Sequence, residues 1–309
     1  MGAVAFARAN APLCARAVWW QSRAHPEGSV QPMIDMLTAA ASEAIRWENL
    51  GLRPGIDLGF FTLRFYSLAY LCGIALGYWH LTKMVKAPGS PMAQRHADDL
   101  FVYCTLGIIL GGRLGYATFY KHELWTSLDL FKVWEGGMSF HGGVIGTTIA
   151  IAFVSWRGQL NFLRVCDYIS VNVGFGMLFG RIANFINGEL WGRPATDVPW
   201  AMIFPGDPMG LPRHPSQLYE AVLEGAVVIA VMLPLFWYTR ARWRPGLLVG
   251  AFVSLITAGR FTAEFFREPD AGWGAFSAET GLNWGQWLTI PLFLIGIALI
   301  VRALRRPTL

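Results

Sequence analysis

A polar run closes one apolar stretch of this sequence and carries side chains able to bind an anion. The run covers residues 180–193 and directly follows the apolar residues 171–179. Its polar members include Arg181, Asn184, Asn187 and Glu189. Charged side chains are costly at membrane depth, so their presence there predicts a functional site. Arg181 and Asn184 share one helix face, while Gly188 and Gly192 can end the helix and let backbone approach a ligand. The simpler interpretation is a snorkelling arginine beside a capped helix end.

Two glycine-rich segments place an arginine and a histidine in or beside other apolar stretches. The first segment covers residues 111–116, where glycines permit close helix approach. Arg113, Tyr116 and Tyr120 lie along one face of the same predicted helix. In the second, residues 135–143, His141 supplies an imidazole that can exchange a proton near neutral pH. The simpler interpretation of the first segment is a helix-packing interface in which Arg113 is structural. The simpler interpretation of the second is that His141 is a hydrogen-bonded structural residue.

An arginine and a glutamate four residues apart, Arg260 and Glu264, share one face of a further apolar stretch. A self-neutralised ion pair explains them most simply, and Glu220, in a preceding helix start, fits a first-turn acid. However, Arg113, Arg181 and Arg260 outnumber the acidic partners within the apolar stretches, so a shared anionic ligand accounts for them better. Arginine clusters bind phosphate through several charge-assisted hydrogen bonds. In a membrane the abundant phosphate belongs to lipid.

The composition requires that these side chains be carried by helices in a bilayer. Hydrophobic residues make up 54% of 309 residues and charged residues 15%, with a mean hydropathy of +0.40. An ordinary water-soluble domain does not have this composition. Seven stretches are close to the length of about 20 residues that crosses a bilayer: 58–80, 99–120, 138–156, 165–186, 217–238, 246–266 and 284–301. The sequence therefore predicts an all-α, polytopic integral membrane protein with about seven transmembrane helices.

Basic residues orient the predicted spans, because short cytoplasmic loops carry an excess of lysine and arginine. The connections after spans one, three and five and the segment after span seven are basic, whereas the other three connections mix charges. This pattern predicts a cytoplasmic C-terminus and an external start of span one. The net charge of +5 is then a topology signal that requires no nucleic acid. The four cysteines show no close spacing and suggest neither a metal site nor a disulfide framework.

The first 57 residues differ from the rest, which forms one membrane domain over 58–309. They lack a long apolar run and contain scattered arginines and prolines. Two interpretations remain open: a poorly ordered extension, or a true translation start near Met33 or Met36. Residues 33–47 are expected to form a short interfacial helix.

Several motifs, in order along the apolar spans, resemble bacterial phosphatidylglycerol–prolipoprotein diacylglyceryl transferases. They are Arg64-Phe65-Tyr66, residues 111–116, residues 136–143, the run 180–192, residues 213–220, and Arg260 with residues 264–267. The resemblance covers nearly all of 58–309. It implies an inner-membrane enzyme that moves the diacylglyceryl group of phosphatidylglycerol onto the lipobox cysteine of a preprolipoprotein, releasing glycerol phosphate. It implies no metal and no soluble cofactor.

The resemblance also assigns roles to residues. Arg181 and Arg260 hold the lipid headgroup, Glu264 supports Arg260, and His141 is a further active-site residue. The expected substrate-binding set is Tyr66, Arg113, Asn184, Asn187, Glu189, Gly192 and Tyr219. One departure is Ile256, where the family often has tyrosine; Tyr219 or Tyr116 are candidates to supply the missing hydroxyl.

The implied chemistry leaves two questions open at this point. A thiol attacks as thiolate, so either His141 takes its proton or the positive arginines suffice to lower its pKa. A different class of protein, an anion- or lipid-binding membrane transporter without chemistry, is the main alternative. No inverted repeat supports it, and no His-Glu-x-x-His or serine elbow supports an intramembrane protease.

Overall fold

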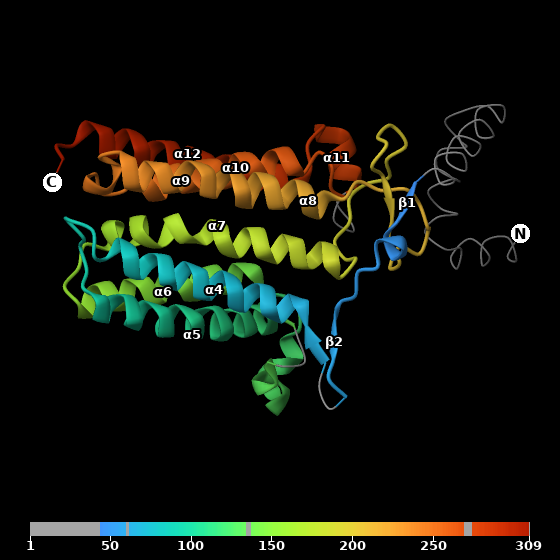
Figure 1. Ribbon diagram of the computed structural model, residues 1–309, viewed down its shortest axis with the longest axis horizontal. Helices are drawn as coiled ribbons and strands as arrows, with labels where there is room; N and C mark the ends of the chain where they lie inside the picture. Colours follow the sequence, from blue (N-terminus) through green and yellow to red (C-terminus); the bar gives the residue numbers. More distant parts are fainter. Residues whose placement is uncertain (1–43, 60–61, 134–136, 269–273, 309) are drawn as a thin grey trace, which may run out of the picture. The chain divides into compact units, whose positions relative to one another are not determined.

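The computed structural model describes residues 44–59, 62–133, 137–268 and 274–308, and helices dominate it (Figure 1). The long helices are α4 (Phe65–Met84), α5 (Gln94–Phe119), α6 (Phe140–Arg157), α7 (Phe162–Ile186), α9 (Val227–Tyr238), α10 (Leu247–Ala263) and α12 (Trp284–Arg305). Two short helices, α8 (Ser216–Glu220) and α11 (Gly274–Thr280), join them. Each of the seven predicted apolar stretches coincides with a helix, which confirms the helical fold class.

Among the residues that the structure describes, four helical segments are long and apolar enough to cross a membrane: Gln94–Phe119, Phe162–Ile186, Ser216–Tyr238 and Trp284–Arg305. The segment Leu247–Ala263 is apolar but shorter. The chain is therefore a helical membrane protein, and the total of seven spans stays a prediction. Many large apolar side chains point outward, among them Leu71 at 61%, Ile149 at 63% and Leu294 at 60% exposure. In water such a surface would aggregate, whereas lipid is its natural solvent.

The start of the first predicted span is wrong, because the span contains a strand, β3 (Thr62–Arg64), before its helix begins. β2 (Gly55–Asp57) pairs antiparallel with β3, and α4 begins only at Phe65. Pro54 and Gly55 favour extended or turn backbone here, and the hairpin crosses the expected domain boundary at residue 57. Apolarity alone did not separate strand from helix over these residues.

Most of the interfacial helix predicted over 33–47 lies outside the described residues, which begin at 44. Its last residues are not part of an α-helix. Strand β1 (Ile45–Arg46) pairs parallel with β4 (Met202–Ile203), and a 3-10 turn, η2 (Trp47–Leu50), follows. The Trp47 side chain is buried and its indole N–H donates to the Phe185 carbonyl at 2.8 Å. At residues 45 and 46 a long-range strand pairing therefore takes the place of the predicted helix.

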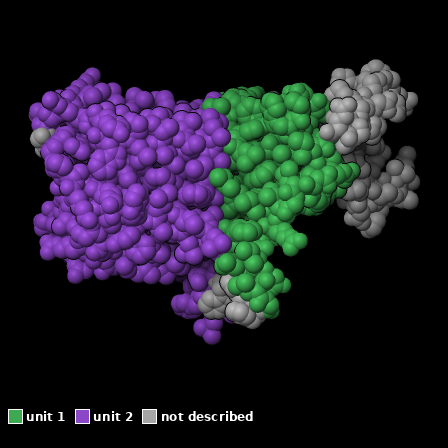
Figure 2. Space-filling view, viewed as in Figure 1, with its two compact units in different colours: residues 1–66, 181–219, 262–284 green, residues 67–180, 220–261, 285–309 purple. Residues whose placement is uncertain are grey.

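The chain divides into two compact units, shown in Figure 2. The first contains residues 1–66, 181–219 and 262–284, and the second contains 67–180, 220–261 and 285–309. In the second unit, buried side chains of several helices form one core that includes Met84, Leu100, Tyr168, Phe236 and Leu248. In the first unit, Trp47, Met202 and Phe204 form a smaller core.

Helices α5 and α6 lie side by side (Figure 1) and meet through glycines. A Cβ atom on Gly146 would overlap the Gly107 carbonyl oxygen, and one on Gly142 would overlap that of Gly111. Backbone thus packs against backbone, the arrangement that small residues permit between membrane helices. This confirms the close helix approach expected from the glycine-rich segments.

Candidate functional site

The polar run at the end of α7 folds around the Glu189 carboxylate. Oε1 of Glu189 accepts from Nδ2 of Asn184 at 2.8 Å and from Nδ2 of Asn187 at 3.3 Å. Gly188 ends the helix with φ 66°, a left-handed conformation that glycine adopts without strain. Gln217 donates through Nε2 to the Glu189 carbonyl at 2.6 Å. Three of the predicted residues are therefore brought together. Arg181 lies in the same helix, three residues before Asn184.

Gly192 is required by a backbone contact. Its N–H donates to the His214 carbonyl at 2.9 Å, and the next N–H, of Arg193, donates to the Phe266 carbonyl at 3.0 Å. A Cβ atom on Gly192 would overlap the Phe266 carbonyl oxygen. The close backbone approach predicted for Gly192 thus exists, but its partner is another segment of the chain.

Arg213 closes the loop that follows the polar run. It is 3% exposed, and its Nε and Nη2 donate to the two carboxylate oxygens of Asp207 at 2.6 and 3.0 Å. Its Nη1 reaches the Gly192 carbonyl at 3.2 Å and Glu268 at 2.5 Å. Burial works to raise the pKa of the Asp207 carboxyl, but bonds from Arg213 and from the N–H groups of Met209 and Leu211 outweigh it and lower that pKa. Mixed charge in the loop was the only sign of this pairing at the level of sequence.

Tyr219 belongs to a hydrogen-bonded chain with two residues that the sequence did not single out. Trp200 Nε1 donates to the Tyr219 hydroxyl at 2.6 Å, and that hydroxyl lies 3.2 Å from His214 Nδ1. Burial and the nearby Arg193 lower the pKa of His214, which favours its neutral form. A neutral His214 that accepts the tyrosine proton at Nδ1 carries its own proton on Nε2. Phe266 packs edge-on against both rings.

Arg260 on α10 has two buried carboxylates beside it. Its Nη1 lies 3.4 Å from Glu220 Oε2 and 3.7 Å from Glu224 Oε1. The arginine side chain is 28% exposed, whereas the two glutamates are at most 2% exposed. Glu224 lies in the π-helical turn η6 (Ala221–Ala226), a distortion frequent at functional sites. Glu264, the expected neighbour of Arg260, lies 3.4 Å from Arg267.

The sequence did not identify Glu224 and treated Glu220 only as a first-turn acid. Their spacing of four residues within an apolar stretch is the signal that could have found them as a pair.

Arg113 donates mainly to backbone carbonyls. It is 6% exposed; Nε reaches the Leu130 carbonyl at 2.9 Å, Nη1 reaches Gly137 at 3.3 Å, and Nη2 reaches the Asp129 carbonyl. These contacts hold the turn η4 (Leu128–Phe131) against α5. They agree with the structural interpretation of this arginine, and its substrate-binding role stays a prediction.

His141 lies in the first turn of α6, where its side chain is exposed and packs edge-on against Phe140. Ser139 begins the helix, with its Oγ accepting from the Gly142 N–H at 3.3 Å. Tyr66 lies in the first turn of α4 and is partly buried. Both residues therefore project from helix starts.

The predicted residues divide between the two units. The first unit holds Tyr66, Arg181, Asn184, Asn187, Glu189, Gly192, Tyr219 and Glu264, and the second holds Arg113, His141 and Arg260. Among residues the structure describes, no group of three or more His, Cys, Asp or Glu side chains could hold a metal ion.

Apolar helices that carry arginines with acidic or carbonyl partners define a polytopic membrane protein with polar sites at its helix ends. A family model described as prolipoprotein diacylglyceryl transferase matches residues 55–302. The chain belongs to the prolipoprotein diacylglyceryl transferase family, and it is a bacterial membrane transferase.

Curated relatives carry one name, phosphatidylglycerol–prolipoprotein diacylglyceryl transferase. A protein of Erythrobacter litoralis is 68% identical over 269 residues, covering 87% of this chain and 95% of the relative. A protein of Zymomonas mobilis is 46% identical, covering 85% of this chain and 94% of its own length. One from Azospirillum brasilense is 47% identical over 82% of this chain and 97% of its own length. The similarity therefore extends over nearly the whole of each relative.

Proposed function

We infer that this chain transfers the diacylglyceryl group of phosphatidylglycerol to prolipoproteins, the reaction that the names of its relatives describe. The family match over residues 55–302 is the observation that carries this conclusion. In finer detail, we propose that the acceptor is the lipobox cysteine thiol of a preprolipoprotein. The products are a thioether-linked lipoprotein precursor and glycerol phosphate.

The proposed step is a displacement at a glyceryl carbon. The thiolate sulfur forms a C–S bond while the C–O bond to phosphate breaks, and the departing glycerol phosphate takes the electron pair. Negative charge grows on the phosphate, so fixed guanidinium groups aimed at it lower the barrier. We assign this role to Arg181 and Arg260. The buried Glu220 and Glu224 support the assignment for Arg260, because they hold its guanidinium before substrate arrives.

The thiol must lose its proton before or during the attack. We propose that His141 accepts it, since an exposed imidazole at a helix start is accessible to a partner chain. Glu189, held by two amides, and Tyr219, held by Trp200, are proposed to shape the substrate site. Tyr66, Arg113, Asn184, Asn187, Gly192 and Glu264 complete the proposed set.

We propose that the protein resides in the inner membrane, with the start of its first span outside and its C-terminus in the cytoplasm. The basic connections after α4, α6 and α9 and the basic end of α12 support this orientation. It would place the loop after α7, with the Asp207–Arg213 pair, on the external side.

Incubation of purified protein with phosphatidylglycerol labelled in its acyl chains and a lipobox peptide tests the reaction. We expect label on the peptide and release of glycerol phosphate in equal amounts. A matched peptide with serine in place of cysteine controls for the thiol and should remain unlabelled. Binding of the lipid without label transfer would instead support the anion-binding transporter.

A further inference from the structure

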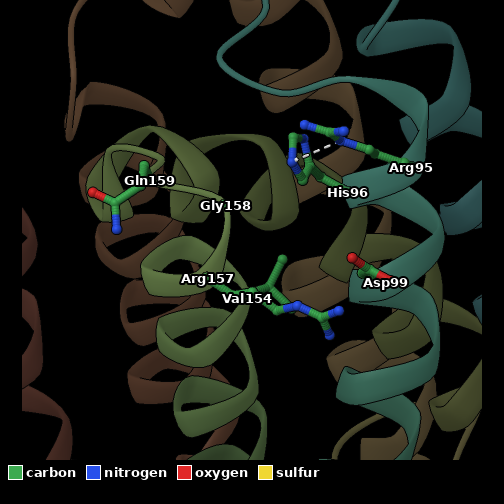
Figure 3. A pocket seen from close by; sticks show the side chains of 7 residues that line it. All are labelled: Arg95, His96, Asp99, Val154, Arg157, Gly158 and Gln159. Carbon is green, nitrogen blue, oxygen red and sulfur yellow. Dashed lines mark hydrogen bonds between the residues drawn. The ribbon is translucent and has the colours of Figure 1, made fainter.

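A cavity of about 330 Å³ lies between α5 and α6, and none of its lining residues is assigned to the transfer reaction. Its lining comes from the start of α5 and the end of α6: Arg95, His96, Asp99, Val154, Arg157, Gly158 and Gln159. Figure 3 shows Arg157 reaching from α6 toward the α5 side, where Arg95, His96 and Asp99 lie. The volume is within the range of about 300–1,000 Å³ that ligand pockets have.

The cavity carries an excess of positive charge. Two guanidinium groups, Arg95 and Arg157, face one carboxylate, Asp99, among the lining residues. Both arginines are exposed, so a ligand can reach them without displacing a buried ion pair. Arg157 is fixed in part by its Nη1, which donates to the Tyr103 hydroxyl at 3.3 Å. The charge favours an anion over a cation or a neutral group.

The His96 ring lies between two N–H donors. The side chain is 8% exposed, its Nδ1 lies 3.1 Å from the Ala93 backbone N–H, and its Nε2 lies 3.3 Å from Arg95 Nε (Figure 3). A neutral imidazole accepts at only one of its two ring nitrogens, so one of these donors requires another acceptor. Arg95 is exposed, so its guanidinium is the donor that an outside anion can reach.

The surface beside the cavity is aromatic and faces outward. Tyr103, the partner of Arg157, packs on Phe153 with ring centroids 5.1 Å apart, and Phe153 packs on Trp156 at 6.3 Å. Phe153 is 39% exposed and Trp156 is 72% exposed. Aromatic rings of this kind mark the border between a bilayer and water. An anion in the cavity would therefore have an apolar surface next to it on which an acyl chain can lie.

We propose that this cavity binds a phosphate group through the guanidinium groups of Arg95 and Arg157, and that the phosphate is the headgroup of an anionic membrane lipid. The shared chemistry, phosphate oxygens accepting from two guanidinium groups, would also suit free phosphate. The aromatic surface favours the lipid. This lipid is separate from the substrate lipid, because no lining residue belongs to the proposed transfer site.

Native mass spectrometry of the purified protein with dihexanoyl phosphatidylglycerol tests the proposal. Arg95→Gln with Arg157→Gln removes the two charges, and Arg305→Gln with Arg306→Gln, both exposed at the end of α12, is the matched control. We expect the wild type and the control to retain one more bound lipid than the cavity variant. Dihexanoyl phosphatidylcholine should show no such difference. Affinity at this site should fall at least about tenfold, the effect of losing one charge-assisted hydrogen bond.

Calorimetric titration with inorganic phosphate distinguishes the two sources. If the wild type binds phosphate and the cavity variant does not, while both retain the same number of lipids, the site binds free phosphate. Equal lipid counts and no phosphate binding in all proteins would overturn the proposal, as would an equal loss in the control pair. Diacylglyceryl transfer by the cavity variant should stay at the wild-type rate with excess substrate. If the wild type itself fails to transfer the diacylglyceryl group, that result counts against the proposed function. The number of bound lipids still tests the cavity separately.

Discussion

Single arginines in this protein are held by different kinds of partner, and the partner indicates what each arginine can do. Arg113 donates to three backbone carbonyls, and these hydrogen bonds stabilise the local fold. Arg260 instead has the buried Glu220 and Glu224 beside its Nη1. Two carboxylates orient the fork. This arrangement favours a guanidinium aimed at charge that develops during a reaction.

Replacing either proposed phosphate-binding arginine by lysine should therefore lower turnover strongly. Lysine keeps the charge but loses the planar fork. We expect Arg181→Lys and Arg260→Lys each to lose at least about 10²-fold in kcat, the effect of removing one preorganised donor. The label-transfer assay measures this. Arg302→Lys, on the exposed end of α12, is the control. Normal rates in both test variants would exclude the phosphate role.

A second residue-level prediction concerns His141. If its imidazole takes the thiol proton, His141→Gln should lower turnover at neutral pH by about 10²–10⁴-fold, the usual contribution of a general base. Raising the pH toward about 8.5, the pKa of a free thiol, should recover part of the loss because thiolate then forms unaided. The pH profile of label transfer measures this. A deficit that stays constant with pH would mean that His141 only supports the start of α6.

At the level of elements, the loop between α7 and α8 depends on one buried ion pair. Asp207 has a lowered pKa in the folded protein, so its contribution to stability is present above its unfolded pKa of about 3.9 and is lost as pH falls through the lower folded value. Asp207→Asn should destabilise the protein by about 3 kcal/mol at neutral pH, because the buried Arg213 then loses the carboxylate that binds it through two oxygens.

Thermal unfolding in detergent measures this loss. The difference between wild type and Asp207→Asn should be constant from about pH 7 to 5 and shrink below about pH 4, as the wild-type carboxyl protonates. Asp197→Asn, at an exposed residue of the same loop, is the control. A difference that does not change with pH would show that the carboxylate charge is unimportant.

The pairing of α5 with α6 gives a prediction with a control in the same helix. A Cβ atom on Gly146 would overlap the Gly107 carbonyl oxygen, whereas one on Gly143 would have only an ordinary contact at 3.8 Å. Gly146→Ala should therefore force the helices apart and cost about 1–3 kcal/mol, the usual range for overpacking. Gly143→Ala should be neutral or slightly stabilising, since alanine favours helix. Equal unfolding temperatures of the two variants in detergent would contradict the close packing of α5 against α6.

These elements also show which parts of the structure the sequence could predict. Apolar length identified every long helix, because it depends only on local composition. The second strand of the hairpin, β3, was mistaken for helix, since it is held by pairing with β2. Asp207 with Arg213 and Trp200 with Tyr219 were missed for a related reason: their contacts join loop positions that carry no periodic pattern. Local patterns therefore predicted the helices, while long-range contacts decided the details of the site.

For the whole molecule, the remaining prediction is its orientation in the membrane. The structure identifies suitable reporter positions: Lys86 and Arg240 are exposed in basic connections, and Asp197 is exposed in the loop after α7. Asp207 would not serve, because it is buried. Single cysteines at these three positions should be placed in a background from which Cys14, Cys72, Cys104 and Cys166 have been removed.

An impermeant thiol reagent applied to intact cells should label cysteine at Asp197 and leave those at Lys86 and Arg240 unlabelled. Labelling of all three after the cells are opened is the control for accessibility. The expectation follows from the excess of basic residues in short cytoplasmic loops. The reverse pattern would place the loop after α7, with Gly192 and the Asp207–Arg213 pair, in the cytoplasm. The acceptor thiol would then have to reach the polar run from the opposite side of the membrane.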